Sequence, residues 1–439
     1  MRFVTTRGEA PAASLTYALF DGLAPDGSLY VPESIDRWAD DEIARLTSMS
    51  LTDIGKRLLR PYVSDEINEA ALESIVVGGL NFPIPLVEVE HGVFALELFH
   101  GPTLAFKDVA ARLMARIMSA LHDGGDPTTI LVATSGDTGG AVGNAFYGVP
   151  HMRVVILYPQ GRVSRTQEAQ LTMFNGEEGS NVRAYAVAGS FDDAQGLVKS
   201  VWTDTELLNR VRLSSANSIN IGRLLPQMIY YFHAMAQLMR IAPGSRSDVV
   251  FSTPSGNFGN LTAGLMAKRA GLAITSFVSP TNVNDVVPIY LQTGRFEPRP
   301  SRQTLANAMD VGNPSNFDRM LWLYRGDHAA MSRDLSGSRH DDAEVREAIR
   351  LVYEERGYLL DPHSAIGYLG LSTRARRPRP LDMQVFLATA HPAKFAEIVG
   401  PVIDRPIPKP AALSEALAKR QHILKMDRSL SALKAVLGG

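Results

Sequence analysis

The chain has 439 residues, and 45% of them are hydrophobic, so it is long enough for two or three domains with their own cores. Its 44 Lys and Arg residues against 46 Asp and Glu residues give a net charge of -2, which excludes a general basic surface for nucleic acid or an anionic membrane. The absence of cysteine excludes disulfides, thiolate nucleophiles and Cys-ligated metal sites.

The sequence contains no sign of export or of a membrane partner. Residues 1–9 have no apolar run of signal-peptide length, and no later stretch approaches about 18 uninterrupted apolar residues. We therefore expect a cytoplasmic protein. The ten histidines lack the spacing of metal ligands, so no metal site is predicted.

Residues 1–80 are predicted to be mostly helical, with amphipathic stretches at about 39–60 and 64–77. Residues 85–90 and 93–99 alternate in polarity around the pair His91-Gly92, which predicts a β-hairpin with a two-residue turn. This hairpin leads the chain into the next segment.

From about residue 105 to 280, short apolar runs alternate with helical periodicity. This pattern predicts a parallel sheet covered by helices on both faces, with ligands bound outside the carboxyl ends of the strands. Residues 295–345 show little strand pattern and are interpreted as an excursion over the active-site face or a surface. A Pro-rich linker from residue 401 leads into two short helices. The predicted strands are 129–133, 152–157, 181–187, 249–252, 274–278 and 383–388.

Lys107 is the first candidate for chemistry. It opens a predicted buried helix directly after Leu104, Ala105 and Phe106. Burial lowers the pKa of an amine toward neutrality, which is what Schiff-base chemistry requires. The alternative is a lysine that extends its ammonium group from a helix start into solvent.

A second candidate is the loop Ser255-Gly256-Asn257-Phe258-Gly259-Asn260, between the predicted strand 249–252 and a helix that starts at about residue 261. Small residues let backbone amides converge at a helix N-terminus, where a phosphate is favoured. The loop lacks the lysine of a P-loop and the third glycine of a dinucleotide site, so it suits one phosphate monoester. A plain strand-to-helix turn remains the alternative.

A third loop, with Thr134, Ser135, Asp137 and Thr138, follows the predicted strand 129–133. Hydroxyl groups and amides at a helix N-terminus can receive a carboxylate. Capping of the helix by Ser135 or Asp137 is the alternative.

A fourth cluster contains Asn217, Ser218 and Arg223 at the start of a long predicted helix. An amide, a hydroxyl and a guanidinium together form a second anion site, because an arginine can hold a phosphate through two parallel hydrogen bonds. A helix cap beside a surface arginine would also fit this pattern. The strand 383–388 ends near Thr389 and His391, and the histidine is interpreted as structural rather than catalytic.

In this order, the motifs resemble the threonine synthases, and specifically the longer branch of that family with an added N-terminal domain. The resemblance runs from residue 5 to about 400. The segments that carry it are 5–8, 22–33, 99–108, 133–139, 217–223, 255–260, 307–316 and 388–395.

The resemblance implies an α/β fold of the fold type II pyridoxal-phosphate enzymes. Two open, twisted, parallel-rich α/β domains would hold the cofactor between them, and a mostly helical N-terminal domain would precede them. The implied division is residues 1–90 for the N-terminal domain, 91–125 with 213–400 for the large cofactor-binding domain, 126–212 for a small mobile domain and 401–439 for a C-terminal helical extension.

The resemblance also implies roles for individual residues. Lys107 would form the Schiff base with pyridoxal phosphate and then act as the mobile acid and base. Thr389 would face the pyridine nitrogen, and Asp137 would lie either at the cofactor's 3' oxygen or at the substrate. The other cofactor-binding residues would be Ser255, Gly256, Asn257, Phe258, Gly259 and Asn260. The substrate-binding residues would be Thr134, Ser135, Asp137, Thr138, Asn217, Ser218 and Arg223.

The implied reaction is the conversion of O-phospho-L-homoserine and water to L-threonine and phosphate, by γ-elimination and β-addition of water. The protein would act as a monomer or homodimer, without nucleic acid. One alternative is another pyridoxal-phosphate lyase of the same fold, such as a dehydratase, which would not need Asn217, Ser218 and Arg223. Another is a nucleotide-binding or regulatory module that uses the glycine loops without chemistry.

Overall fold

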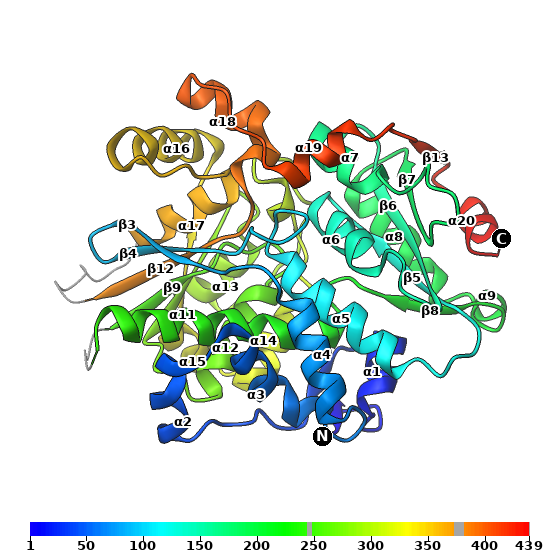
Figure 1. The fold of residues 1–439 in the computed structure, drawn as a ribbon, viewed down its shortest axis with the longest axis horizontal. Coiled ribbons are helices and arrows are strands. Elements are labelled where there is room, and N and C mark those ends of the chain that lie inside the picture. Colours follow the sequence, from blue (N-terminus) through cyan, green and yellow to red (C-terminus); the bar gives the residue numbers. More distant parts are fainter. Residues whose placement is uncertain (244–247, 373–381, 439) are drawn as a thin grey trace.

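The computed structural model describes residues 1–243, 248–372 and 382–438, and its strands form three sheets. The smallest sheet is an antiparallel pair near the N-terminus, formed by β1 (Phe3–Thr5) and β2 (Tyr30–Pro32). The other two are the large sheet, with six strands, and the small sheet, with five. Figure 1 shows the large sheet on the left of the molecule and the small sheet on the right.

The small sheet has the order β13-β7-β6-β5-β8, and all its neighbouring strands are parallel. Alternate residues of β5 point to opposite faces, as strand geometry requires. Ile130 and Val132 join a core with helix α6, whereas Leu131 and Ala133 join another core with helix α8. Its strands are β5 (Thr128–Ala133), β6 (Met152–Pro159), β7 (Val182–Val187), β8 (Arg212–Ser215) and β13 (Leu424–Met426).

The large sheet has the order β11-β10-β9-β12-β4-β3, and only the β3–β4 hairpin in it is antiparallel. It is also buried on both faces, because Phe251 and Val385 belong to one core while Val250 and Phe386 belong to another. Its strands are β3 (Leu86–Glu90), β4 (Val93–Glu97), β9 (Val249–Ser252), β10 (Ser276–Thr281), β11 (Leu335–Arg339) and β12 (Met383–Ala388).

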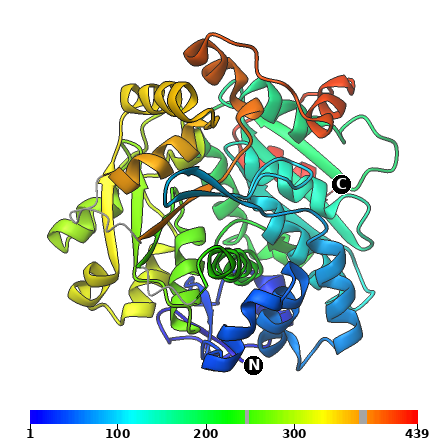
Figure 2. The same ribbon diagram turned by 60° about the vertical axis from the view of Figure 1, so that its left-hand side comes forward.

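The N-terminal segment packs beneath the large sheet in Figure 1, and helix α11 lies between them. Figure 2 shows α11, in mid-green, nearly along its axis, with the blue N-terminal helices beside it. The predicted amphipathic stretch 39–60 is interrupted, since Ser50 caps a new helix by accepting a hydrogen bond from the amide of Asp53. The N-terminal helices are α1 (Leu15–Asp21), α2 (Asp40–Ala44), the 3-10 helix η1 (Arg45–Ser48), α3 (Leu51–Val63) and α4 (Glu69–Gly79).

The remaining helices cover the two larger sheets. Those around the small sheet are α6 (Asp137–Phe146), α7 (Arg165–Thr172), α8 (Phe191–Val201), α9 (Thr205–Leu208), α19 (Ala411–Ala418) and α20 (Leu430–Gly438). The others are α5 (Lys107–Leu121), α10 (Ile221–Leu224), η2 (Leu225–Gln227), α11 (Met228–Ile241), α12 (Gly259–Arg269), α13 (Val286–Thr293), η3 (Asn307–Met309), α14 (Phe317–Tyr324), α15 (His328–Asp334), α16 (Asp342–Arg356), α17 (Pro362–Ser372), η4 (Pro392–Phe395) and α18 (Ala396–Ile403).

The predicted architecture of two parallel-rich α/β sheets with N-terminal helices is confirmed, as are the hairpin and all six predicted strands. Residues 295–345, interpreted from the sequence as an excursion with little strand pattern, contain the strand β11, which pairs with β10. The predicted helical extension 401–439 contains the strand β13 as well as helices. The division into domains stays a prediction.

Within the described residues, no helix is both long and apolar enough to cross a membrane. The mostly buried helix α11 instead packs on the N-terminal elements η1 and α3, and α12 packs on α11.

Candidate active site

A cavity of about 900 Å³, a volume that includes the space at its opening, lies between the two larger sheets. The N-terminal ends of several helices that pack on these sheets line it. Fourteen of the fifteen predicted site residues line it, although Lys107 and Thr389 among them are 282 residues apart in the chain. They are Lys107, Thr134, Ser135, Asp137, Thr138, Asn217, Ser218, Arg223, Gly256, Asn257, Phe258, Gly259, Asn260 and Thr389.

Ser255, the remaining predicted residue, is buried behind the glycine loop rather than in the cavity wall. Its hydroxyl lies 3.0 Å from the carbonyl oxygen of Thr253 and 2.9 Å from Oδ1 of Asn260, and it can donate its one proton to either of them. Asn260 in turn donates from Nδ2 to the carbonyl of Pro254 at 2.8 Å. These bonds fix the shape of the loop, so Ser255 acts on the site through the backbone.

The glycine loop is tightly confined before helix α12 begins. A Cβ atom at Gly256 would lie 2.5 Å from the carbonyl oxygen of Ala308 and 2.9 Å from Cα of Met309. Phe258 caps the helix with a φ of 60°, a left-handed conformation that is uncommon for a large side chain. The first turn of α12 therefore points backbone N–H groups without intrahelical partners toward the cavity.

Lys107 lies at the first position of α5, and its side chain is 13% exposed. Burial lowers the pKa of its amine to about 8, against attraction from Asp137 and with help from the positive charges of Lys394 and Arg223. Its Nζ lies 3.9 Å from Oδ2 of Asp137, beyond hydrogen-bond distance. The alternative of an ammonium group extended into solvent is therefore wrong.

Asp137 is the first residue of α6 and does not cap that helix. Thr134 contributes to capping instead, because its hydroxyl accepts hydrogen bonds from the amides of Gly136 and Gly139, both at 2.9 Å. Burial by itself would raise the pKa of Asp137, but Lys394 and Lys107 outweigh it and hold that pKa below its ordinary value. An ionised carboxylate thus faces the cavity.

Arg223 is 4% exposed, which excludes the alternative of a surface arginine. Its Nη1 donates to the carbonyl of Ala216 at 2.6 Å, while its buried Nε has no hydrogen-bond partner in the part of the chain that the structure describes. Burial lowers the pKa of this guanidinium to about 10. A buried cation with a spare donor in a cavity wall is suited to bind an anion.

Asn217 and Ser218 precede Arg223 and line the same wall. The Asn217 side chain donates from Nδ2 to the carbonyl of Ala133 at 2.8 Å, which ties this segment to the end of β5. The carbonyl of Ser218 accepts from Nη1 of Arg319 at 3.0 Å. The hydroxyl of Ser218 is thereby placed on a backbone that is held from both sides.

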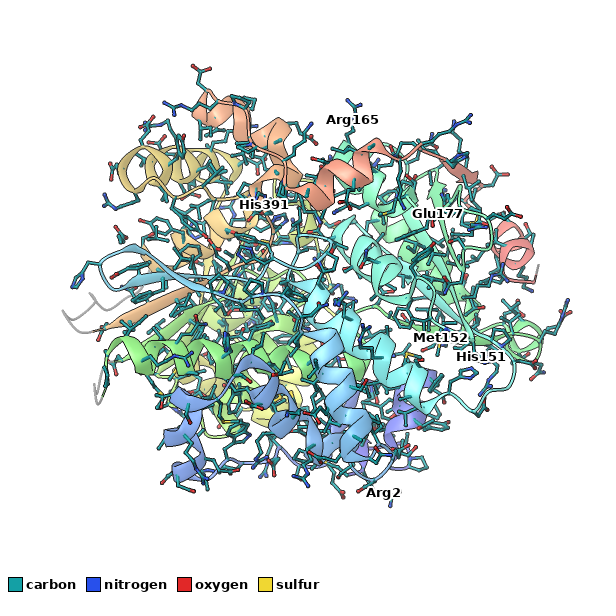
Figure 3. The ribbon with its side chains drawn as sticks, viewed as in Figure 1. Arg2, His151, Met152, Arg165, Glu177 and His391 are labelled. Atoms are coloured by element: carbon teal, nitrogen blue, oxygen red, sulfur yellow. The ribbon has the colours of Figure 1, made fainter. Side chains whose placement is uncertain are left out.

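Thr389 follows the carboxyl end of β12 and is buried in the cavity wall. Its carbonyl accepts a hydrogen bond from the amide of Phe106 at 2.8 Å, so it also fixes the start of the Lys107 helix. His391, labelled in Figure 3, does not line the cavity and instead accepts a hydrogen bond at Nδ1 from the amide of Ala393 at 3.1 Å. This contact agrees with the structural role predicted for His391.

Several residues of the site were not predicted from the sequence. Lys394 is fully buried, and its ammonium group lies 2.8 Å from Oδ1 of Asp137. His363 contacts Asp361 through Nδ1 at 2.6 Å and accepts from the amide of Ala308 through Nε2 at 3.2 Å, which holds the segment opposite the glycine loop. The other cavity-lining residues that were missed include Gln227, Asn307 and Asp310.

The residues present fit pyridoxal phosphate. The cofactor needs a buried lysine for its aldehyde, a phosphate cradle and a polar partner for its ring nitrogen. Lys107, the N-terminal turn of α12 and the hydroxyl of Thr389 line one cavity and can supply these three features. Among the described residues, no group of three or more His, Cys, Asp or Glu side chains is arranged to hold a metal ion.

Comparison with known proteins agrees with this site. Three family models match the chain: "Threonine synthase N terminus" over residues 2–80, "Pyridoxal-phosphate dependent enzyme" over residues 80–389 and "Threonine synthase, C-terminal" over residues 364–437. Threonine synthase from Haemophilus influenzae is 41% identical over 429 residues, covering 97% of each chain.

Solved structures give the same result across the whole fold. The crystal structure of threonine synthase from Escherichia coli matches with a TM-score of 0.91 and 38% identity, covering 99% of both chains. The pyridoxal-phosphate-bound threonine synthase from Brucella melitensis matches with a TM-score of 0.90 and 37% identity, covering 100% of this chain and 99% of the other. The chain therefore belongs to the threonine synthase family of pyridoxal-phosphate-dependent enzymes.

Proposed function

We propose that this enzyme converts O-phospho-L-homoserine and water into L-threonine and inorganic phosphate. The observation that carries the proposal is Arg223, a buried guanidinium in the cavity wall whose Nε has no hydrogen-bond partner among the described residues. Arg223 belongs to α10, whereas the glycine loop precedes α12, so the cavity offers two separate sites suited to a phosphate. A dehydratase acting on serine or threonine would need only the cofactor's site.

The glycine loop would hold the cofactor phosphate through the amides of Gly256, Asn257 and Gly259 at the start of α12. Lys107 would bond to the cofactor's aldehyde carbon, and the Thr389 hydroxyl would contact the ring nitrogen. Asp137 lies beside Lys107 and would face the cofactor's 3' oxygen or the substrate's amino end. When bound, pyridoxal phosphate supplies an electron sink conjugated to the substrate's α carbon.

Lys107 would then move the protons of the reaction. Its Nζ, once released by the incoming substrate, would remove the α proton and then the β proton. Phosphate would leave from the γ carbon, that carbon would be protonated, and water would add at the β carbon. A pKa of about 8 places the amine close to neutrality, where it can both accept and return a proton.

The substrate would be held at its two ends. The hydroxyls of Thr134, Ser135 and Thr138 at the start of α6 would receive its carboxylate. The cluster of Asn217, Ser218 and Arg223 would receive its phosphate. The substrate carboxylate would bind at α6, one of the helices that cover the small sheet. We therefore propose that the small sheet and its helices move toward the large sheet and exclude water before phosphate leaves.

Phosphate release from O-phospho-L-homoserine, with identification of the amino-acid product, tests this function. We expect equal amounts of phosphate and threonine to form. The same preparation should be offered serine and threonine alone, with detection of a keto acid. Keto-acid formation from those two, without threonine from the phosphorylated substrate, would favour a dehydratase and contradict the proposal.

The state of the enzyme as a monomer or homodimer, its independence of nucleic acid and its cytoplasmic location stay predictions. Sedimentation of the purified protein would decide the first. Labelled protein observed in intact cells would decide the last.

A further inference from the structure

Lys394 is a fully buried lysine that lies beside the reacting groups. It belongs to the 3-10 helix η4, six residues after the end of β12. Its Nζ lies 2.8 Å from Oδ1 of Asp137 and donates a hydrogen bond to the carbonyl of Thr103 at 2.9 Å. Burying an ammonium group costs desolvation free energy unless the group is paired with an opposite charge. The contact with the Asp137 carboxylate offsets this cost.

Asp137 therefore lies between two lysines. Its Oδ1 contacts Lys394 at 2.8 Å and accepts a hydrogen bond from Nε2 of Gln167 at 3.0 Å. Its Oδ2 lies 3.9 Å from Nζ of Lys107. The carboxylate is held by the first lysine and only approaches the second.

This asymmetry matters for Lys107. A carboxylate in full contact with an ammonium group stabilises the charged form and raises the pKa of the amine. A carboxylate already engaged by Lys394 attracts Lys107 less, and the ammonium group of Lys394 also repels the protonated form of Lys107. The other titratable groups that face this cluster are Arg223 from α10, Asp361 before α17, His363 on α17 and Asp108 on α5.

We propose that Lys394 is a positioning residue, which holds the Asp137 carboxylate away from full contact with Lys107 and so keeps the Lys107 amine available in its neutral form. This inference rests on the role proposed above for Lys107. It assigns to Lys394 no contact with the substrate or the cofactor. Asp137 carries the effect from one lysine to the other.

Lys394 also joins η4, which follows the large sheet, to α7 beside the small sheet, and it does so through its backbone carbonyl oxygen. Its backbone carbonyl accepts hydrogen bonds from the hydroxyl of Thr166 at 2.7 Å and from that of Ser164 at 3.2 Å, both at the start of α7. The ammonium group and the carbonyl can therefore be tested separately. Substitution at Thr166 changes the second contact and leaves every charge in place.

The test measures the pKa of Lys107 in cofactor-free protein, from the pH dependence of its labelling by acetic anhydride and peptide mapping. In Lys394→Met we expect this pKa to rise by about one unit or more, because Asp137 turns fully to Lys107 and the repulsion is lost. Lys394→Arg should restore the lower value. Thr166→Val, the matched control, should leave the Lys107 pKa unchanged.

The same measurement in an Asp137→Asn background separates the two ways in which Lys394 can act. Asp137→Asn alone should lower the Lys107 pKa, and this variant tests the proposal even if Lys394→Met does not fold. The rise caused by Lys394→Met should be smaller in that background, because the carboxylate that carries it is gone. No rise, an equal rise in both backgrounds, or an unchanged pKa in Asp137→Asn would overturn the proposal.

Because labelling needs neither cofactor nor turnover, its result is independent of the proposed reaction. An enzyme that forms no threonine but shows these shifts would contradict the proposed function and leave the role of Lys394 standing. An enzyme that forms threonine but lacks these shifts in the Lys107 pKa would support the proposed function and contradict the role of Lys394.

Discussion

At the scale of single residues, the clearest case is Arg223, which is buried and forms no salt bridge within the part of the chain that the structure describes, although Asp108 attracts it. Burying a charge without a paired counter-charge costs free energy, and an apolar side chain of similar size does not carry this cost. We therefore expect Arg223→Met to keep or raise the free energy of unfolding. Its kcat/KM for O-phospho-L-homoserine should fall by several decades, since losing one partner of a desolvated charge pair costs about 2–5 kcal/mol.

The paired measurements are urea unfolding and steady-state kinetics on the same preparation. Inorganic phosphate at high concentration should raise the unfolding temperature of the cofactor-loaded wild type more than that of the variant. A variant that is much less stable and equally active would mean that Arg223 serves packing instead of substrate binding.

Lys107 gives a prediction with a definite dependence on pH. Its pKa is about 8 in the folded protein against 10.5 for the unperturbed side chain, so the unfolded state binds more protons between these values. The stability contributed by this group therefore rises with pH across that window. The cost of burying the ammonium group is complete below about pH 8 and disappears near pH 10.5.

Lys107→Met lacks this cost. We compare the free energy of unfolding of the cofactor-free variant with that of wild type. The variant's advantage should be about 3 kcal/mol larger at pH 7 than at pH 10.5, because this is the free energy that corresponds to the shift in the pKa of Lys107. Denaturant unfolding at a series of pH values measures the difference, in which groups common to both proteins cancel. A constant difference across the window would show that Lys107 is not desolvated.

The sequence allowed the main site residues to be predicted because they follow strands and begin helices, where ligand-binding loops of α/β proteins lie. Lys394, Gln167 and His363 also lie in the first turn of a helix, so their position in the chain does not by itself distinguish them from helix-start residues that lie outside a site. Each is an ordinary residue within a helical segment, and its importance arises only because the fold brings it to Asp137 or to the segment 307–310. Contacts between residues so far apart in the chain cannot be inferred from spacing.

At the scale of elements, the glycine loop before α12 depends on the segment that faces it. The backbone of η3 leaves no room for a side chain at Gly256, where a Cβ would meet the carbonyl of Ala308 and Cα of Met309. We expect Gly256→Ala to push the loop from η3 and to weaken binding of pyridoxal phosphate more than tenfold. Cofactor titration followed by absorbance measures the change.

Gly140→Ala is a suitable control, because it lies inside α6 and its Cβ would meet no atom closer than 3.6 Å. It should bind the cofactor normally and gain a little helix stability. Equal cofactor affinity in Gly256→Ala and wild type would show that the loop adapts to the added methyl group.

The sequence predicted the interior strands of the two larger sheets better than their edge strands. The interior strands β5, β6, β9 and β12 are apolar on both faces and stand out as short hydrophobic runs. In the two larger sheets three strands escaped prediction, β8, β11 and β13, and each lies at the edge of its sheet; β1 and β2 of the smallest sheet were also missed. An edge strand needs fewer apolar residues, and β11 reads Leu-Ser-Gly-Ser-Arg, with only its leucine buried.

At the scale of the whole molecule, the C-terminal segment belongs to the small sheet, although the chain reaches it from the large one. Helix α18 follows the large sheet, α19 packs on α7, and β13 then pairs with β7. Figure 1 shows this segment in orange and red, passing over the top of the molecule from left to right. It therefore links the two halves on the side opposite the N-terminal helices.

The end of this segment stabilises the small-sheet half. Leu433 of α20 is fully buried and shares a core with Val198 and Val201 of α8. The guanidinium of Arg153 in β6 donates hydrogen bonds to the carbonyls of Val436, at 2.5 Å, and Leu437, at 3.3 Å. Helix α8 is thus held between the small sheet and α20.

Leu433→Ala should therefore loosen one half of the molecule and spare the other. A buried leucine replaced by alanine costs about 2–5 kcal/mol. Because the large sheet has its own cores, we expect faster amide hydrogen exchange in α8, β6 and β7 and unchanged exchange in β9 and β12. Leu208→Ala, at a half-exposed position in the same half, should change stability by less than about 0.5 kcal/mol. Exchange that quickened equally in both sheets would instead mean that the two halves unfold as one cooperative unit.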